Sequence, residues 1–323
     1  TINYLFMKKF VAIGQVDSGK STLCGHLLYK CGYIDERGME KIRLKAQEDG
    51  ANTCIYARVL DVYEEEMERG KTHEFDTVTF NYKDKQYQLI DTPGHQKFVR
   101  SMIEGISHQV NIAVLMISMK DNEFEAAFGP GMMKEHIVLC RAVGIEHMIL
   151  LPNKMDFIDW DEKRCKDKVM QVTKYLVKNV GWPKENLSVV PISAFNGMGL
   201  VDTVGIPEWY KGKSFLDTLD SLSDKPMEMF TDLIESNRFV CEMNNFGTEG
   251  TMMTAGYLCV AHFNGQESES TIEKIQGKVF LRGGENAKCI IVLPQKEMLA
   301  VGMRVIYRKG NNTVGFGKIT SVK

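Results

Sequence analysis

The sequence predicts two domains of different class: an α/β domain with a mostly parallel, doubly wound sheet, followed by a small antiparallel β-barrel. Up to about residue 225, short continuous apolar runs alternate with helical stretches, which is typical of strands covered on both faces. Beyond that point the helical period ends, and strand-like segments follow one another between glycines and asparagines. The 323 residues suffice for two such domains, which we place at 1–225 and 226–323.

The strands expected in the first domain are buried runs and one hairpin. The runs KKFVAIG, NIAVLMIS, HMILLPN and LSVVPIS occupy residues 8–14, 111–118, 147–153 and 187–193. TVTFNY (77–82) and QYQLID (86–91) are expected to be two strands joined by a polar turn at residues 83–85, as in a hairpin. In the second domain, six or seven short strand-like segments without helical periodicity indicate the barrel.

Composition excludes several classes of protein. The longest apolar run, around residues 112–119, is too short to cross a bilayer, and the first residues lack the apolar segment and cleavage site of a signal peptide. The eight cysteines form no C-x-x-C pair, which favours reduced thiols in a cytoplasmic protein over disulfides or a zinc site. A net charge of −2 provides no overall basic field, so any contact with nucleic acid would need a local patch. We expect a monomer without a membrane partner.

The segment GQVDSGKST fits the phosphate-loop pattern G-x-x-x-x-G-K-S, between an expected strand and a helix expected at 20–31. Its glycines let backbone N–H groups turn toward a phosphate, Lys20 would neutralise the β- and γ-phosphates, and the Ser21 hydroxyl would bind Mg²⁺. The simpler alternative is a glycine turn that caps a helix. The nucleotide-binding residues expected here are Gly14, Gln15, Val16, Asp17, Ser18, Gly19, Lys20, Ser21 and Thr22.

The phosphate loop does not select a base, but two later segments do. Asn153, Lys154 and Asp156 belong to NKMD at the end of an expected strand. The Asp156 carboxylate can accept hydrogen bonds from N1–H and the 2-amino group of guanine, whereas adenine would leave it unpaired at a cost of ~1–3 kcal/mol. Ser193, Ala194 and Phe195 follow another strand and would complete the base pocket through backbone N–H groups. These segments predict GTP as the nucleotide.

Two segments between these motifs predict the groups around the γ-phosphate. In DTPGH, Asp91 would hold Mg²⁺ through a water, and the Gly94 amide would sense the γ-phosphate. His95 could position the attacking water; the alternative is a surface histidine at a helix start. Thr72, just before the strand that leads to Asp91, is placed to supply a second hydroxyl to Mg²⁺.

The motifs GQVDSGKST, RGKT, DTPGH, NKMD and SAF, in this order and spacing, resemble the translational GTPases of the elongation factor Tu and elongation factor one-alpha superfamily. GHQKFVRSMIEG, KEHIVL and EWYKGKSFLDTLD are similar to the branch that holds the eukaryotic elongation factor, the release-factor GTPase and the ribosome-rescue GTPase. The resemblance is close over residues 7–225. It is looser over 230–322, where the final NNTVGFGKITSV looks like the end of the family's third domain.

The resemblance assigns further roles. Val16 would form one side of a hydrophobic gate over the attacking water, and Asp17 would help bind a monovalent cation. Gln15 stands where the elongation factors usually have histidine, and we expect this difference to have little effect. Lys71 stands where they usually have the isoleucine of the gate. The release-factor type has a similar Gly-Lys-Thr at this place, which favours a role of this chain in termination or rescue. Together with Lys20, Thr72 and His95, Val16 completes the expected catalytic set.

The resemblance implies a switch that binds and hydrolyses GTP with Mg²⁺ and acts with the ribosome or a release-factor-like protein. Two alternatives stay open: a GTP-dependent regulator of a protein partner outside translation, and a GTPase subunit that drives another reaction. The segments 230–231, 254–257 and 313–315 look like the family's third domain, whereas the G-x-V-rich strands of its second domain are not seen. We therefore expect the second domain to be absent, and no stable ternary complex with GTP and aminoacyl-tRNA.

Overall fold

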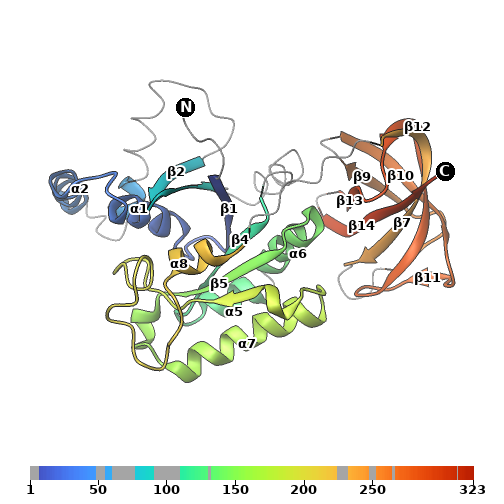
Figure 1. Ribbon diagram of the computed structural model, residues 1–323. Coiled ribbons are helices and arrows are strands. Elements are labelled where there is room, and N and C mark those ends of the chain that lie inside the picture. The colour runs from blue at the N-terminus through green and yellow to red at the C-terminus, as the bar shows by residue number, and fades with distance from the viewer. Residues whose placement is uncertain are drawn as a thin grey trace, which may run out of the picture.

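The computed structural model describes residues 7–48, 55–59, 77–90, 110–129, 132–223, 232–246, 252–263, 266–310 and 312–323. Within these ranges the chain forms an α/β domain and a closed barrel, so the predicted fold class is confirmed (Figure 1). The expected domain boundary at 225 and the site residues Lys71, Thr72, Asp91, Gly94 and His95 lie outside the described residues. No helix in the described ranges is apolar over a length that could cross a membrane.

The α/β domain is built on a six-stranded sheet with the order β2-β3-β1-β4-β5-β6. Its strands are β1 (Met7–Ile13), β2 (Thr77–Tyr82), β3 (Lys85–Ile90), β4 (Ile112–Ser118), β5 (His147–Asn153) and β6 (Leu187–Val189). All neighbours are parallel except the β2–β3 hairpin. The strand β6 is shorter than the predicted run 187–193. Beyond Val189 the chain still forms hydrogen bonds to β5, but it then turns at Ser193, which bridges to Met198.

Helices cover both faces of this sheet, as the continuous apolar strands require. On one face lie α1 (Lys20–Lys30), α2 (Glu36–Glu48) and α8 (Phe215–Ser221), and on the other α5 (Glu123–Phe128), α6 (Met133–Val143) and α7 (Glu162–Lys178). Successive β1 residues alternate between the two cores: Phe10 packs with the first group and Val11 with the second. Full burial of such a side chain contributes ~1.5–3 kcal/mol to the stability of the fold, so the helices on both faces stabilise the sheet.

The second domain is a closed barrel with the strand order β10-β12-β7-β14-β13-β9. Its strands are β7 (Ile234–Asn245), β9 (Leu258–Phe263), β10 (Gln266–Ile275), β12 (Asn286–Leu299), β13 (Arg304–Lys309) and β14 (Asn312–Val322). All of these pair antiparallel, and closure leaves no free strand edge in the ring. The short strands β8 (Met253–Thr254) and β11 (Phe280–Leu281) form a separate ribbon.

The barrel packs directly on the α/β domain through β13, β14 and the helix α6 (Figure 1). Ile306 of β13 belongs to the apolar core that α6 closes, and Phe316 of β14 packs against the same core. Gly144 ends α6 with φ 100°, and a Cβ there would lie 2.5 Å from Nε of Arg304 on the barrel. A side chain here would displace the flexible end of Arg304, and the left-handed φ itself favours glycine at this position.

Candidate nucleotide-binding site

The phosphate-loop segment lies between β1 and α1, with tightly constrained glycines at both ends. Gly19 has φ 99°, and a Cβ there would lie 2.3 Å from Nδ2 of Asn153. A Cβ on Gly14 would lie 2.7 Å from Oγ of Ser18. A larger residue at Gly19 would press on β5, and one at Gly14 would press on Ser18 of the loop and on Met116 of β4, so glycine at both positions follows from this close packing.

Lys20 and the start of α1 give the loop a cationic character. The Lys20 ammonium donates hydrogen bonds to the carbonyl oxygens of Gly14 and Gln15, at 3.1 and 3.0 Å, and so closes the loop over the first turn of the helix. That first turn, which contains Ser21 and Thr22, carries no acidic residue, and the helix has no side-chain cap. The helix dipole and the N–H groups of this first turn therefore favour an anion here.

Asn153, at the end of β5, joins the phosphate loop to the segment around Ala194. Its Nδ2 donates to the carbonyl of Ser18 at 2.8 Å, and its Oδ1 accepts from the amide of Ala194 at 2.9 Å. The side chain is only 2 % exposed, so both hydrogen bonds lie in the interior, where an unpaired group is costly. Three segments that are distant in the sequence are thus held together by one amide.

The other polar residues of NKMD sit on the same edge of the sheet. Asp156 lies in the short 3-10 helix Met155–Ile158, and its buried Oδ1 has no hydrogen-bond partner among the residues that the structure describes. A buried carboxylate oxygen of this kind fits a ligand that brings N–H donors, as the guanine edge does. Lys154, with φ 65°, turns its ammonium to 2.6 Å from the carboxylate of Glu123.

The sequence analysis did not single out Glu123. Its carboxylate accepts from Lys154 and, at 2.7 Å, from the Ser118 hydroxyl at the end of β4. Burial raises the pKa of Glu123, but the hydrogen bonds from Lys154 and Ser118 outweigh it, so the pKa lies below its usual value and the group stays ionised. An acidic residue soon after a buried strand, at the carboxyl edge of the sheet, was the available signal.

His26 was also missed. It lies on α1, and its Nδ1 is 2.7 Å from the carbonyl oxygen of Ala194. Burial lowers the pKa of His26 to about 4, so the ring is neutral near pH 7. Its ring stacks on that of Tyr56 at 4.1 Å, and Phe195, 44 % exposed, meets the edge of the same tyrosine. A histidine among the buried apolar residues of α1 was the signal.

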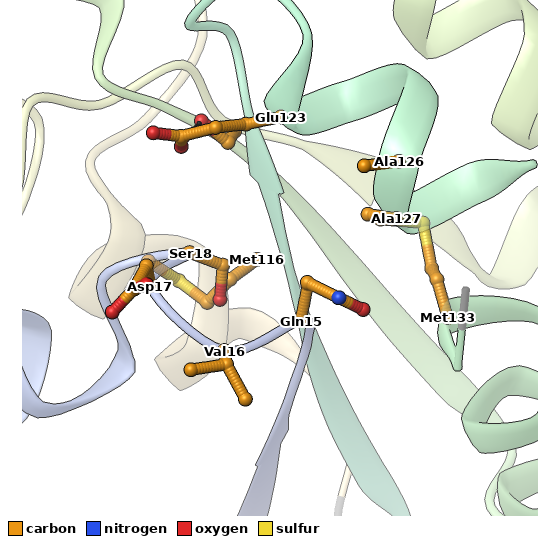
Figure 2. Close-up of a pocket in the computed structure, with 10 residues that line it drawn as sticks. Gln15, Val16, Asp17, Ser18, Met116, Glu123, Ala126, Ala127 and Met133 are labelled. Carbon is orange, nitrogen blue, oxygen red and sulfur yellow. Dashed lines mark hydrogen bonds between the residues drawn. The ribbon is translucent and has the colours of Figure 1, made fainter.

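A pocket of about 170 Å³ adjoins the phosphate loop on the side of α5 and the start of α6 (Figure 2). It is lined by Gln15, Val16, Asp17, Ser18, Met116, Ser118, Glu123, Ala126, Ala127 and Met133. Gln15 points toward Ala127 and Met133, and its buried Oε1 has no hydrogen-bond partner within the described part of the chain. The 61 % exposed Val16 extends from the loop in another direction (Figure 2), so the two residues face different surroundings.

The predicted Mg²⁺ ligands are only partly within the described residues. Ser21 is exposed in the first turn of α1, where its hydroxyl is accessible to a cation beside a bound phosphate. Over the ranges that the structure describes, no group of three or more His, Cys, Asp or Glu side chains could hold a metal ion. A serine hydroxyl at this place is a ligand type that Mg²⁺ accepts in nucleotide sites.

The doubly wound sheet and the glycine loop between β1 and α1 define the class of the first domain, a P-loop nucleotide-binding domain. The family model described as the elongation factor Tu GTP binding domain matches residues 7–235. The chain belongs to this family.

Relatives from both elongation and termination match this chain. It is 43 % identical over 211 residues to elongation factor 1-alpha 2 of Euplotes crassus, covering 65 % of this chain and 48 % of that protein. It is 40 % identical over 219 residues to the eukaryotic peptide chain release factor GTP-binding subunit of Schizosaccharomyces pombe, covering 66 % and 33 %. The chain thus spans about half or less of the length of these relatives.

The fold of the whole chain is also similar to a solved structure. The S. cerevisiae Ski7 GTPase-like domain, solved with GDP and inorganic phosphate, superposes with a TM-score of 0.72 at 15 % identity. The match covers 98 % of this chain and 97 % of that one. At this identity the likeness concerns the fold, in which an α/β domain and a barrel are combined.

Proposed function

We propose that this protein is a molecular switch that binds GTP and GDP, hydrolyses GTP, and acts in translation. The observation that carries the proposal is the Asn153 amide, which joins Ser18 of the phosphate loop to Ala194. The buried Asp156 carboxylate oxygen, which has no partner among the described residues, supports it. A phosphate site and a base site with acceptors for guanine N–H groups are thereby held at a fixed spacing. Membership in a family of GTP-binding domains supports the same nucleotide.

The residues divide the work of binding and hydrolysis. Lys20 and the N–H groups at the start of α1 would bind the β- and γ-phosphates, and Ser21, Thr72 and Asp91 would hold Mg²⁺, which neutralises charge on the phosphates. Asp156 would bind the guanine, and Asp17, exposed with φ 63°, would bind a monovalent cation. His95 would orient the attacking water, with Val16 shielding it.

We further propose a partner in translation: the ribosome or a release-factor-like protein, in the cytoplasm. Elongation and release factors match this chain at similar identity, which supports translation without selecting one of the two roles. We assign residues 1–225 to the GTP-binding domain and 226–323 to a barrel corresponding to the third domain of elongation factors. In this assignment the second domain is absent, so the chain forms no stable ternary complex with aminoacyl-tRNA.

Nucleotide specificity tests the base site. Titration calorimetry should show binding of GDP and GTP and little binding of ATP. Asp156→Asn should weaken GDP binding by about 10- to 150-fold and shift the preference toward xanthosine diphosphate, because the amide donates where the carboxylate accepts. Equal affinities of the unaltered protein for ATP and GTP would refute the proposal.

The rate of GTP hydrolysis with and without purified ribosomes tests the switch. Unaided hydrolysis should be slow, on the order of 10⁻⁴–10⁻² s⁻¹. His95→Ala should keep nucleotide affinity and lower the stimulated rate by about a hundredfold or more. His262→Ala, on the barrel strand β9, is the matched control and should hydrolyse GTP at the wild-type rate. An absence of ribosomal stimulation would favour a regulator outside translation.

A further inference from the structure

His26 lies between the phosphate loop and the base site, although it belongs to neither motif. It is on α1, the helix that begins at the phosphate loop, and is only 3 % exposed. Because a carbonyl oxygen can only accept, the 2.7 Å contact with the Ala194 carbonyl requires the proton on Nδ1. In the neutral ring Nε2 carries no proton, and the Tyr56 ring stacks over the imidazole with ring centres 4.1 Å apart, so the Tyr56 hydroxyl lies above the ring and not along the Nε2 lone pair. The hydrogen bond from Nδ1 to Ala194 therefore orients the ring.

This contact links the Ala194 segment, Asn153, the phosphate loop and α1 into one continuous set of hydrogen bonds and chain. Ala194 donates its amide to Asn153 and accepts at its carbonyl from His26. Asn153 in turn donates to the Ser18 carbonyl in the phosphate loop, and the loop continues into the helix that carries His26. The segment around Ala194 is thus held from two sides, and removal of His26 opens one of them.

Two glycines allow the chain to approach His26 this closely. Gly197, with φ 74°, turns directly over the imidazole, and a Cβ there would lie 2.5 Å from Nε2 of His26. A Cβ on Gly25 would lie 1.9 Å from the carbonyl oxygen of Tyr56, so the helical segment 55–59 packs backbone against α1. The surroundings of His26 are therefore fitted to the imidazole ring.

We propose that His26 is a positioning residue for nucleotide binding, which fixes the base-site segment 193–197 relative to the phosphate loop through its hydrogen bond to Ala194. The inference rests on the proposed binding of guanine nucleotides. His26 is not a catalytic residue, since it reaches the site only through Ala194. Its loss should affect how long a nucleotide stays bound, because the Ala194 segment would no longer be fixed beside the base.

The test is the dissociation rate of methylanthraniloyl-labelled GDP from the full chain, measured by displacement with excess GDP. His26→Leu keeps an apolar side chain of similar volume but removes the donor, and dissociation should become about tenfold faster. His26→Asn places an amide Nδ2 near the position of the imidazole Nδ1, and should restore the rate to within about threefold of wild type. His262→Leu, the same change in the barrel, should leave the rate unaltered.

A purely structural role would slow or speed both His26 variants alike, so equal rates for His26→Leu and His26→Asn would overturn the inference. A wild-type rate for His26→Leu would also overturn it, while the proposed function would stand. If the unaltered protein does not bind labelled GDP, the proposed function itself fails.

A second pair of variants covers the case in which His26→Leu does not fold. Gly197→Ala presses a methyl group on the imidazole, and should accelerate GDP dissociation. Gly181→Ala is its control, because Gly181 has a similar φ of 70° but no atom within 4 Å of the added Cβ. The two variants share the same backbone strain, so equal dissociation rates would contradict the role of His26.

Discussion

The buried polar side chains of the two domains differ in what they connect. In the α/β domain, Asn153 and His26 link loops that are far apart in the sequence and surround the candidate site. In the barrel, Asn245 and Ser270 bond the backbone of nearby strands, at 2.8 Å in both cases. The first arrangement fixes a site, whereas the second only supports the wall of the barrel.

The barrel interior also contains three thiols and one tyrosine hydroxyl. Cys241, Cys259 and Cys289 share its core with Tyr307, and the buried Tyr307 hydroxyl has the Cys241 thiol, a weak hydrogen-bonding group, as its polar neighbour. Burial raises the pKa of the Cys241 thiol to about 12 and of Cys289 to about 11, so both stay protonated and unreactive near neutral pH. The comparison teaches that burial alone does not mark a functional polar residue, nor does separation along the chain, since the buried Ser236 of the barrel also bonds a distant backbone group, the carbonyl of Lys323. Whether the joined segments surround the candidate site is more informative.

The largest effect is expected from Asn153→Ala. The substitution leaves the Ser18 carbonyl and the Ala194 amide without their partner, at a cost of ~1–3 kcal/mol for each buried group. All three tryptophans of the chain, at 160, 182 and 209, lie in the α/β domain, so urea unfolding followed by tryptophan fluorescence reports on this domain. Asn179→Ala, at the exposed end of α7, should change the unfolding free energy by less than ~0.5 kcal/mol. Equal losses of unfolding free energy in the two variants would show that Asn153 does not stabilise the contact between these segments.

An intermediate effect is expected from pH. The pKa of His26 falls from 6.5 to about 4 on folding, so between these values the unfolded chain binds more protons and the folded state loses stability as pH decreases. A shift of this size corresponds to ~3 kcal/mol at most. Because Asn does not titrate, the stability of wild type relative to His26→Asn should decline from pH 6.5 to 4 and stay constant above. A constant difference over the whole range would contradict a buried neutral imidazole.

The smallest effect is expected from Tyr307→Phe in the barrel. Removing a buried hydroxyl whose polar neighbour is the weakly hydrogen-bonding Cys241 thiol should change the unfolding free energy by less than ~1 kcal/mol in either direction. Calorimetric unfolding of the full chain would measure this. A loss of stability above ~2 kcal/mol would show that the barrel, too, depends on a hydrogen bond in its core.

The sequence alone determined the two-domain fold, because the signals for it are local. Continuous apolar runs between helical stretches require a sheet covered on both faces, and the structure places successive β1 residues in opposite cores. The pattern from Gly14 to Ser21 likewise requires a loop between a strand and a helix, and the structure has β1 and α1 there. The shorter β6 shows the limit of such patterns, since apolar residues continue beyond the point where the chain turns.

Only the tertiary structure decided how the motifs meet. The hydrogen bond between Asn153 and Ser18 joins residues separated by 135 positions, and the one between His26 and Ala194 spans 168 positions. No local periodicity or spacing in the sequence predicts either hydrogen bond. Glu123 bonds to Lys154 for the same reason: the parallel strands β4 and β5 bring their carboxyl ends to one edge. The packing of α6 on β13, with Gly144 against Arg304, also depends on the relative placement of two folded domains. Local sequence specifies the elements because backbone geometry is a property of neighbouring residues, whereas contacts between distant residues exist only once the chain has folded.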